Sequence, residues 1–279
     1  MLQSVVIKRW TTPRSRDGEN PFSDHRVRHV LAIDAAPQEV NWAVEKVTRG
    51  GLAGLNEALD NSVKIIWHRI FDSNDKAGLL AAFQRFAEQT PCDPRTTTSM
   101  VNVLDELLTN AVYNAPLQDG VRLFASRSRT EHVTSERPVT VGFAVDSTYV
   151  AVIVKDEYGS LSPEELISNL DRCYKARLRQ VQYKSGGAGL GLFMILQNAS
   201  RVIFNLNQNV STEVIVLRKH SERHGRFMHT SPTLNICTPY SAVLTDLRKY
   251  ERRSVSWAAL CRVDERLSLV GAVSYTHLT

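Results

Sequence analysis

Short segments in which apolar residues alternate with polar ones, or run together, recur along the chain and predict β-strands. They are rich in β-branched and aromatic residues and are separated by turn-forming residues. The strands at 140–145 and 149–154 are close enough to form a hairpin. The expected strands cover residues 5–7, 27–35, 63–71, 140–145, 149–154, 201–206, 213–217 and 233–237, the last of them as an edge strand.

Other segments repeat apolar residues every three or four positions, as amphipathic helices do. One helix follows Thr98 or Ser99, either of which can cap it, and ends before Pro116. Another starts at Pro163 with Ser162 as its cap. Further helices are expected at residues 38–59, with a break at two glycines, at 79–87 and at 192–199. Two polar, aperiodic stretches, 118–137 and 171–185, are expected to be surface loops, the second as a mobile cover.

The order of these elements bounds the fold class. Helices alternate with hairpins rather than with single parallel strands, which does not suit a doubly wound parallel sheet. We expect an α+β protein built as a two-layer α/β sandwich, in which a mixed, mostly antiparallel sheet carries its helices on one face.

The helix before Pro116 has a polar line beside its apolar stripe. Glu106, Asn110 and Asn114 follow one another at four-residue spacing, so they lie along one side of the helix. This line either borders a pocket or is the solvated face of an amphipathic helix.

Two later stretches are candidates for ligand binding. Asp156 stands at the end of a buried strand and is followed by Gly159, an arrangement typical either of a binding carboxylate or of a turn-forming aspartate. The densest glycine cluster, residues 186–192, immediately precedes a predicted helix. Its backbone N–H groups, at the positive end of the helix dipole, form a candidate phosphate cradle, although glycine clusters also serve as hinges or tight turns.

Composition narrows the function classes. The 279 residues hold 34 Lys and Arg against 29 Asp and Glu, a net charge of +5, and the basic residues are dispersed, so we expect no nucleic-acid partner. The four cysteines show neither a CxxC nor a Cys/His ligand spacing, which favours a reduced, cytoplasmic protein without a zinc site. We find no signal peptide and no apolar window of membrane length, and we expect no contact with a membrane.

Three motifs, taken together and in this order, resemble the GHKL superfamily of ATPases, and in particular its anti-sigma-factor serine kinases, which act in bacterial signal transduction. The first is E-x-x-x-N-A, here from Glu106 to Ala111, and the second is the aspartate Asp156 with its glycine. The third, G-x-G-L-G-L, spans residues 187–192, and Thr212 matches a threonine of the penultimate strand. The resemblance covers about residues 60–238 and implies a Bergerat-type ATP-binding domain there, with residues 1–59 as an N-terminal segment of unassigned role.

The resemblance also implies roles for single residues. Asn110 would bind a Mg²⁺ that bridges the ATP phosphates, and Glu106 would orient or deprotonate the attacking water or hydroxyl. Asp156 would accept the adenine amino group, with Gly159 in its turn and Thr212 supporting the adenine. The phosphates would be held by Lys184 and by the backbone of Gly187, Gly189, Leu190 and Gly191.

One departure from the family pattern stands out. The family has a glycine two residues after the aspartate, whereas Glu157 and Tyr158 intervene here before Gly159. The turn must therefore differ from that of the family. No H-E-x-x-x-P phosphoacceptor motif, P-loop or dinucleotide fingerprint occurs, which disfavours a sensor histidine kinase and a dehydrogenase.

Residues 239–279 form a linker and a segment similar to the first strands of a PilZ domain, which binds cyclic dinucleotides. Trp257 stands where that family has its second arginine, so a cyclic-dinucleotide ligand is expected only if the domain is genuine and complete. The closing residues 274–279 resemble a sequencing-adapter artefact, from which we expect the native sequence to be truncated there.

Two functions fit these expectations. The first is a regulatory enzyme that hydrolyses ATP or transfers its γ-phosphate and acts on a protein partner. The second is a nucleotide-gated module that binds a partner without catalysis.

Overall fold

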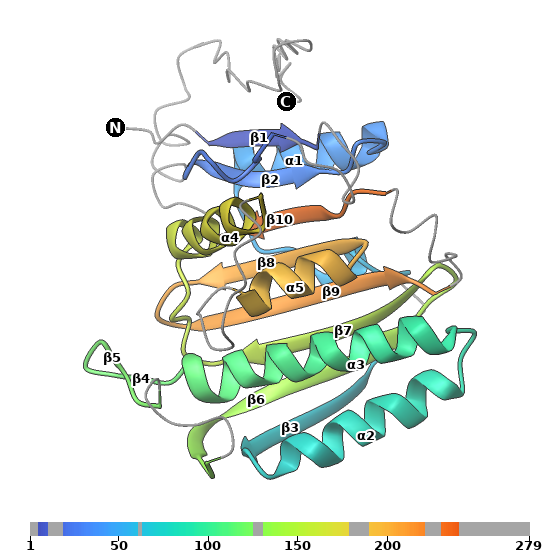
Figure 1. Ribbon diagram of the computed structural model, residues 1–279, viewed down its shortest axis with the longest axis vertical. Helices are drawn as coiled ribbons and strands as arrows, with labels where there is room; N and C mark the ends of the chain where they lie inside the picture. Colours follow the sequence, from blue (N-terminus) through green and yellow to red (C-terminus); the bar gives the residue numbers. More distant parts are fainter. Residues whose placement is uncertain are drawn as a thin grey trace, which may run out of the picture.

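A mixed eight-stranded sheet forms the centre of the computed structural model (Figure 1), which describes residues 5–10, 19–60, 63–124, 131–178, 190–220 and 230–239. The strand order is β1-β2-β10-β8-β9-β7-β6-β3. Only β1 with β2 and β10 with β8 pair in parallel, and the other pairs are antiparallel. The strands are β1 (Val6–Arg9), β2 (Val27–Leu31), β3 (Ile66–Asp72), β6 (Thr134–Val145), β7 (Tyr149–Asp156), β8 (Arg201–Asn207), β9 (Ser211–Lys219) and β10 (Thr233–Cys237).

Helices α2, α3, α4 and α5 lie in front of the sheet in Figure 1, and a short hairpin, β4 with β5, follows the end of α3. This arrangement confirms the α+β class and the mostly antiparallel mixed sheet. The remaining elements are α1 (Pro37–Arg49), η1 (Leu55–Glu57), α2 (Asp75–Glu88), α3 (Pro94–Thr109), the π-helical turn η2 (Asn110–Asn114), β4 (Leu117–Gln118), β5 (Val121–Arg122), α4 (Pro163–Leu178) and α5 (Leu190–Asn198).

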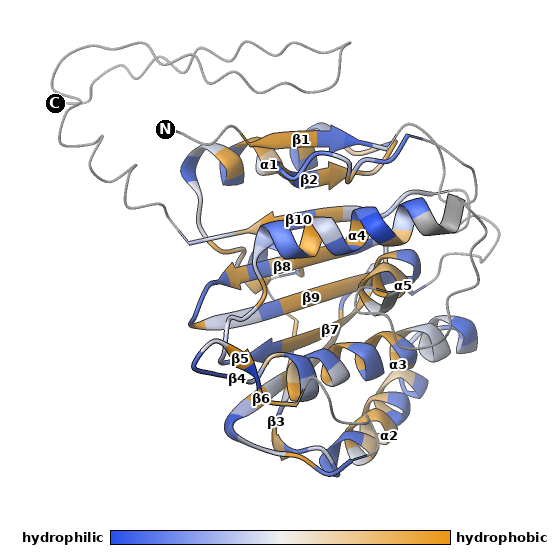
Figure 2. Ribbon diagram, turned by 60° about the vertical axis from the view of Figure 1, so that its left-hand side comes forward, coloured by the Kyte–Doolittle hydropathy of each residue, from blue (hydrophilic) through white to orange (hydrophobic). Residues whose placement is uncertain are grey.

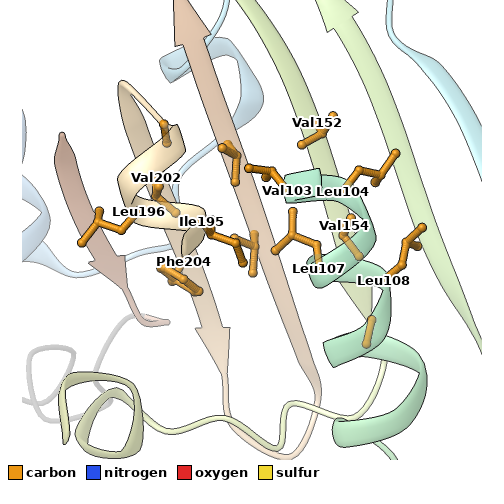
Figure 3. Close-up of a cluster of buried hydrophobic side chains, with 14 of the residues drawn as sticks. Val103, Leu104, Leu107, Leu108, Val152, Val154, Ile195, Leu196, Val202 and Phe204 are labelled. Atoms are coloured by element: carbon orange, nitrogen blue, oxygen red, sulfur yellow. The ribbon is translucent and has the colours of Figure 1, made fainter. Parts of the chain in front are cut away.

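The main core lies between the sheet and this helical layer. Leu107 and Leu108 of α3 pack over Val152 and Val154 of β7 (Figure 3), and all four are nearly or fully buried. The central strands are apolar along most of their length, whereas the helices carry both polar and apolar residues (Figure 2). Burying each such side chain contributes about 1.5–3 kcal/mol, so α3 is fixed firmly to the sheet.

The opposite face of the sheet is also covered. Ile153, Ile203 and Ile215 point to that face and pack against Trp42 of α1 and against Ala53 in the segment after α1. The expectation of helices on one face therefore describes α2 to α5 but not α1. Strands β1 and β2 belong to the same sheet through the pairing of β2 with β10, and the proposed division at residue 59 remains a prediction.

Two expectations about α3 and β10 are wrong. Asp93, not Thr98 or Ser99, caps α3, since its Oδ1 accepts the N–H of Arg95 at 2.9 Å and that of Thr96 at 3.0 Å. Strand β10 is not an edge strand, because it lies between β2 and β8.

The loops expected at 118–137 and 171–185 also need correction. Strands β4, β5 and the start of β6 lie in the first of them. In the second, α4 continues to Leu178 because Tyr174 is buried and packs its ring 6.2 Å, between centroids, from those of Trp10 and Phe22. Residues 179–185 and the PilZ-like segment from 240 onward lie outside the described residues.

The helix expected at residues 38–59 ends at Arg49, and only the short η1 follows between there and residue 59. Ser162 caps α4 as expected, since its Oγ accepts the N–H of Glu165 at 3.1 Å. In the described part of the chain every helix is too short or too polar to cross a membrane.

Candidate functional site

The polar line of α3 coincides with a change in the helix. At Asn110 the α-helix passes into the π-helical turn η2, in which Ala115 N–H donates to the Asn110 carbonyl at 2.9 Å. A π-turn inserts an extra residue and widens the backbone, and such turns are frequent at functional sites. Glu106, Asn110 and Asn114 are all partly exposed on this side, so a ligand can reach them.

Hydrogen bonds join these three side chains in series. Asn114 Nδ2 donates to Asn110 Oδ1 at 2.8 Å, and Asn110 Nδ2 lies 3.4 Å from Glu106 Oε1, at the long end of hydrogen-bond range. The amide oxygen and the carboxylate thereby sit on one side of the helix. Both are hard oxygen donors of the kind that Mg²⁺ prefers.

Gly191, in the first turn of α5, lies directly against Glu106. A Cβ atom at this position would overlap the Glu106 carboxyl group, so only glycine fits while the glutamate keeps its position. Leu190 starts α5 next to it. The structure thus brings the end of the glycine motif to the glutamate of the first motif, whereas Lys184, Gly187 and Gly189 lie outside the described residues.

Asp156 forms the second half of the candidate site. Side chains alternate along a strand, so Asp156 points to the same face as Val152 and Val154, toward the helical layer. Its side chain is 5 % exposed, and its Oδ1 accepts the N–H of Tyr158 at 2.9 Å and of Gly159 at 3.0 Å. Burial raises the pKa of this carboxyl, although the backbone donors lower it in part.

Thr212 stands directly opposite Asp156 in the antiparallel register of β7 and β9. Its N–H and hydroxyl face the carboxyl closely enough to lower the pKa of Asp156. The Thr212 hydroxyl is nevertheless buried without a hydrogen bond of good geometry. Burying a hydroxyl without such a bond, next to a buried carboxylate, costs free energy unless a ligand or a water molecule supplies the missing hydrogen bond.

The turn after Asp156 depends on the glycine at position 159. Gly159 has a φ of 61°, and a Cβ atom there would overlap the backbone of the β8–β9 turn at Asn207. The turn therefore needs its glycine at 159. Tyr158 directs its hydroxyl to Ser135 Oγ, 2.6 Å away, and stacks its ring 5.1 Å from the Arg137 guanidinium. Its side chain is thus held on β6.

The two halves are connected through the core. Strand β7 carries Asp156 at its end, and α3 with η2 packs on the same face of β7. Glu106, Asn110 and Gly191 form one group, and Asp156, Gly159 and Thr212 form the other. A shallow surface depression lined by Pro94, Arg95, Thr98 and Ser99 lies at the other end of α3 and holds none of these residues.

Two basic residues near the site were not found from the sequence. Arg122 of β5 donates to the Asn114 carbonyl at 2.8 Å and to Glu165 Oε1 of α4 at 2.5 Å. Lys76 of α2 forms an ion pair with Asp105 at 2.8 Å, one residue before Glu106. These contacts join residues distant in sequence, and no local pattern signals them.

The donor set bears on the kind of metal the site can hold. Among the described residues no group of three or more His, Cys, Asp or Glu side chains is placed to hold a metal ion. Asn110 with the neighbouring Glu106 offers few protein ligands, which fits a Mg²⁺ held mainly by phosphates and water.

No protein-family model matches the chain, and no curated protein is significantly similar to it. The resemblance to GHKL ATPases therefore rests on the sequence motifs.

Proposed function

We propose that the chain is a Mg-ATP-binding regulatory protein similar to the anti-sigma-factor serine kinases, which acts on a protein partner by ATP hydrolysis or γ-phosphate transfer. In this proposal the sheet with α2 to α5 on one face is a Bergerat-type ATP-binding fold. The observation that carries the proposal is the pairing of Asp156 with Thr212, a buried carboxylate beside a buried hydroxyl that lacks a well-formed hydrogen bond.

This pair suits the edge of an adenine ring. Two backbone N–H groups bind Oδ1 of Asp156, so the carboxylate is held in one orientation and can accept a further donor. The exocyclic amino group of adenine is such a donor, and the Thr212 hydroxyl can donate to a ring nitrogen. Guanine presents a carbonyl oxygen in place of that amino group and would leave the carboxylate facing an acceptor.

The phosphate end of the nucleotide would lie at α3 and α5. Asn110 would offer its amide oxygen to Mg²⁺, and the N-terminal turn of α5 at Leu190 and Gly191 would direct backbone N–H groups to phosphate. Bound Mg²⁺ would neutralise phosphate charge. Glu106 would accept, at its carboxylate, the proton of the attacking water or hydroxyl.

The proposal is tested by nucleotide preference. Wild-type protein is expected to bind ATP more tightly than GTP in isothermal titration with Mg²⁺, and Asp156→Asn should erode this preference. Asp146→Asn is the matched control, because Asp146 Oδ1 also accepts two backbone N–H groups, of Thr148 and Tyr149, at the opposite end of β7. Equal affinities of the wild type for ATP and GTP would refute the assigned role of Asp156.

A second candidate, a nucleotide-gated binding module without catalysis, is supported by the confinement of Glu106. Its carboxyl lies between the Asn110 amide and the Gly191 backbone, a position that also suits a purely structural residue. A catalytic base predicts that Glu106→Gln keeps ATP affinity within a few-fold and lowers turnover by about 10²- to 10⁴-fold. Equal turnover of the wild type and Glu106→Gln, measured with a protein partner present, would favour the binding module.

A further inference from the structure

The hydrogen bonds between Asn114, Asn110 and Glu106 have only one possible direction if Glu106 is ionised. A carboxylate can only accept, so Asn110 must present its NH₂ group to Glu106. The amide oxygen of Asn110 must then face Asn114, which has to donate through its own NH₂ group, at 2.8 Å. An amide oxygen has two lone pairs, and the bond from Asn114 leaves one of them for another partner.

Asn114 is itself anchored from outside the helix. Arg122 donates through Nη1 to the Asn114 carbonyl at 2.8 Å and through Nη2 to Glu165 Oε1 at 2.5 Å. The guanidinium is a rigid planar fork, so a shift of either partner strains the other contact. The π-turn that carries both asparagines is thereby fixed to α4.

We propose that Asn114 and Arg122 are positioning residues of the Mg-ATP site, an inference that rests on the proposed function. Asn114 holds the Asn110 amide with its oxygen turned away from Glu106, and the second lone pair of that oxygen would bind Mg²⁺. Arg122 fixes the turn that carries Asn114 and links it to Glu165 on α4. Without Asn114, only the long 3.4 Å contact with Glu106 still orients the Asn110 amide, and the amide oxygen is held less firmly for a cation.

The effect is expected in the magnesium dependence of nucleotide affinity. Isothermal titration gives the Kd for ATP with Mg²⁺ and with EDTA. The Kd in EDTA divided by the Kd in Mg²⁺ is the magnesium gain, the factor by which the metal tightens ATP binding. Asn114→Leu, close in volume but without a donor, should reduce this gain by about 10-fold, as loss of a ligand's supporting partner does. Its affinity in EDTA and its melting temperature should stay near those of the wild type.

Two further variants make the test specific. Asn114→His, whose ring N–H can replace the amide donor, should restore most of the magnesium gain. Arg122→Met should lower the gain in the same direction as Asn114→Leu, because it frees the turn from α4. Arg95→Met is the control, since Arg95 lies in the first turn of α3, at the end away from Asn114.

The outcomes separate this inference from the proposed function. If wild-type protein binds no ATP with or without Mg²⁺, both are overturned. If the wild type binds and Asn114→Leu keeps the full magnesium gain, the positioning role alone is overturned. A variant that loses affinity equally in Mg²⁺ and in EDTA, with a lowered melting temperature, assigns Asn114 a structural role and also overturns the inference.

Discussion

Gly191 of α5 and Glu106 of α3 are in direct contact, with no room for a side chain between them. Helices α3 and α5 are not consecutive in the chain, and no local sequence motif indicates that they meet. Because of this contact, residue 191 must be glycine if Glu106 is to keep its position. This requirement is separate from any role of the Gly191 backbone in binding phosphate.

We therefore expect Gly191→Ala to destabilise the protein by about 1–2 kcal/mol, because the new methyl group displaces the Glu106 carboxyl. In a Glu106→Ala background the same change should be neutral or stabilising by up to about 1 kcal/mol, since alanine favours the helix. Urea unfolding of the four proteins in this double-mutant cycle measures the coupling. Additive effects of the two substitutions would contradict the contact.

Gly159 is expected to be more sensitive than another glycine of similar conformation. Gly159→Ala combines a left-handed backbone with overlap on the backbone of the β8–β9 turn, and should cost about 3 kcal/mol or more. Gly120, with a φ of 78° and open space around it, is the control, and its alanine variant should cost only about 1–2 kcal/mol. Equal losses in thermal unfolding would show that the packing of Gly159 has no effect.

The local elements follow from the sequence because their causes are local. The apolar runs of β8 and β9 and the apolar stripe of α3 are set by neighbours within a few residues, and β10 has the bounds that its apolar run predicts. The place of β10 between β2 and β8 depends on pairing with distant strands. The pattern around residue 233 carries no information on that pairing, and its prediction of an edge position is therefore wrong.

The same distinction applies to the candidate site. Helical periodicity alone places Glu106 and Asn110 on one side of α3. The helical continuation of α4 depends on Tyr174 meeting Trp10 and Phe22, which come from the other end of the chain. No periodic signal within residues 171–178 indicates those partners, so the sequence pattern predicts a loop there.

Asp156 should make a measurable contribution to the pH dependence of stability. Its pKa is raised above the ordinary value of 3.8 by burial, so the folded state binds a proton more readily than the unfolded state. This contribution favours folding at low pH and is lost as the pH rises through the raised pKa. Relative to the wild type, Asp156→Asn should thus gain stability between pH 4 and neutral pH in urea unfolding. A constant difference across that range would contradict the raised pKa.

His29 should act in the opposite direction. It is 1 % exposed, and its pKa is lowered from 6.5 to about 4. Burial is the main cause, the hydrogen bond with Asn235 raises the pKa in part, and the charges of Arg201, Arg28 and Lys46 contribute to the lowering. The unfolded state therefore takes up a proton before the folded state, and stability falls as the pH drops from about 6.5 to about 4. The loss should reach about 3 kcal/mol in the wild type.

The control for this prediction is His29→Gln, which keeps a donor for Asn235 and cannot titrate. It should be less stable than the wild type at neutral pH but should show a flatter profile below pH 6.5. Because Asp156 and His29 have opposite effects in overlapping ranges, each is read from the difference between wild type and variant. Parallel profiles of the wild type and His29→Gln would contradict a buried neutral histidine.

We propose that this chain binds Mg-ATP between the α3–α5 contact and the end of β7. Isothermal titration of wild-type protein with ATP and Mg²⁺ tests it most directly, with Asn110→Asp as the paired variant. We predict saturable one-to-one binding, weakened about 10-fold or more in Asn110→Asp, because the substitution adds negative charge beside the phosphates. Absence of ATP binding by the folded wild-type protein at millimolar nucleotide would contradict the account.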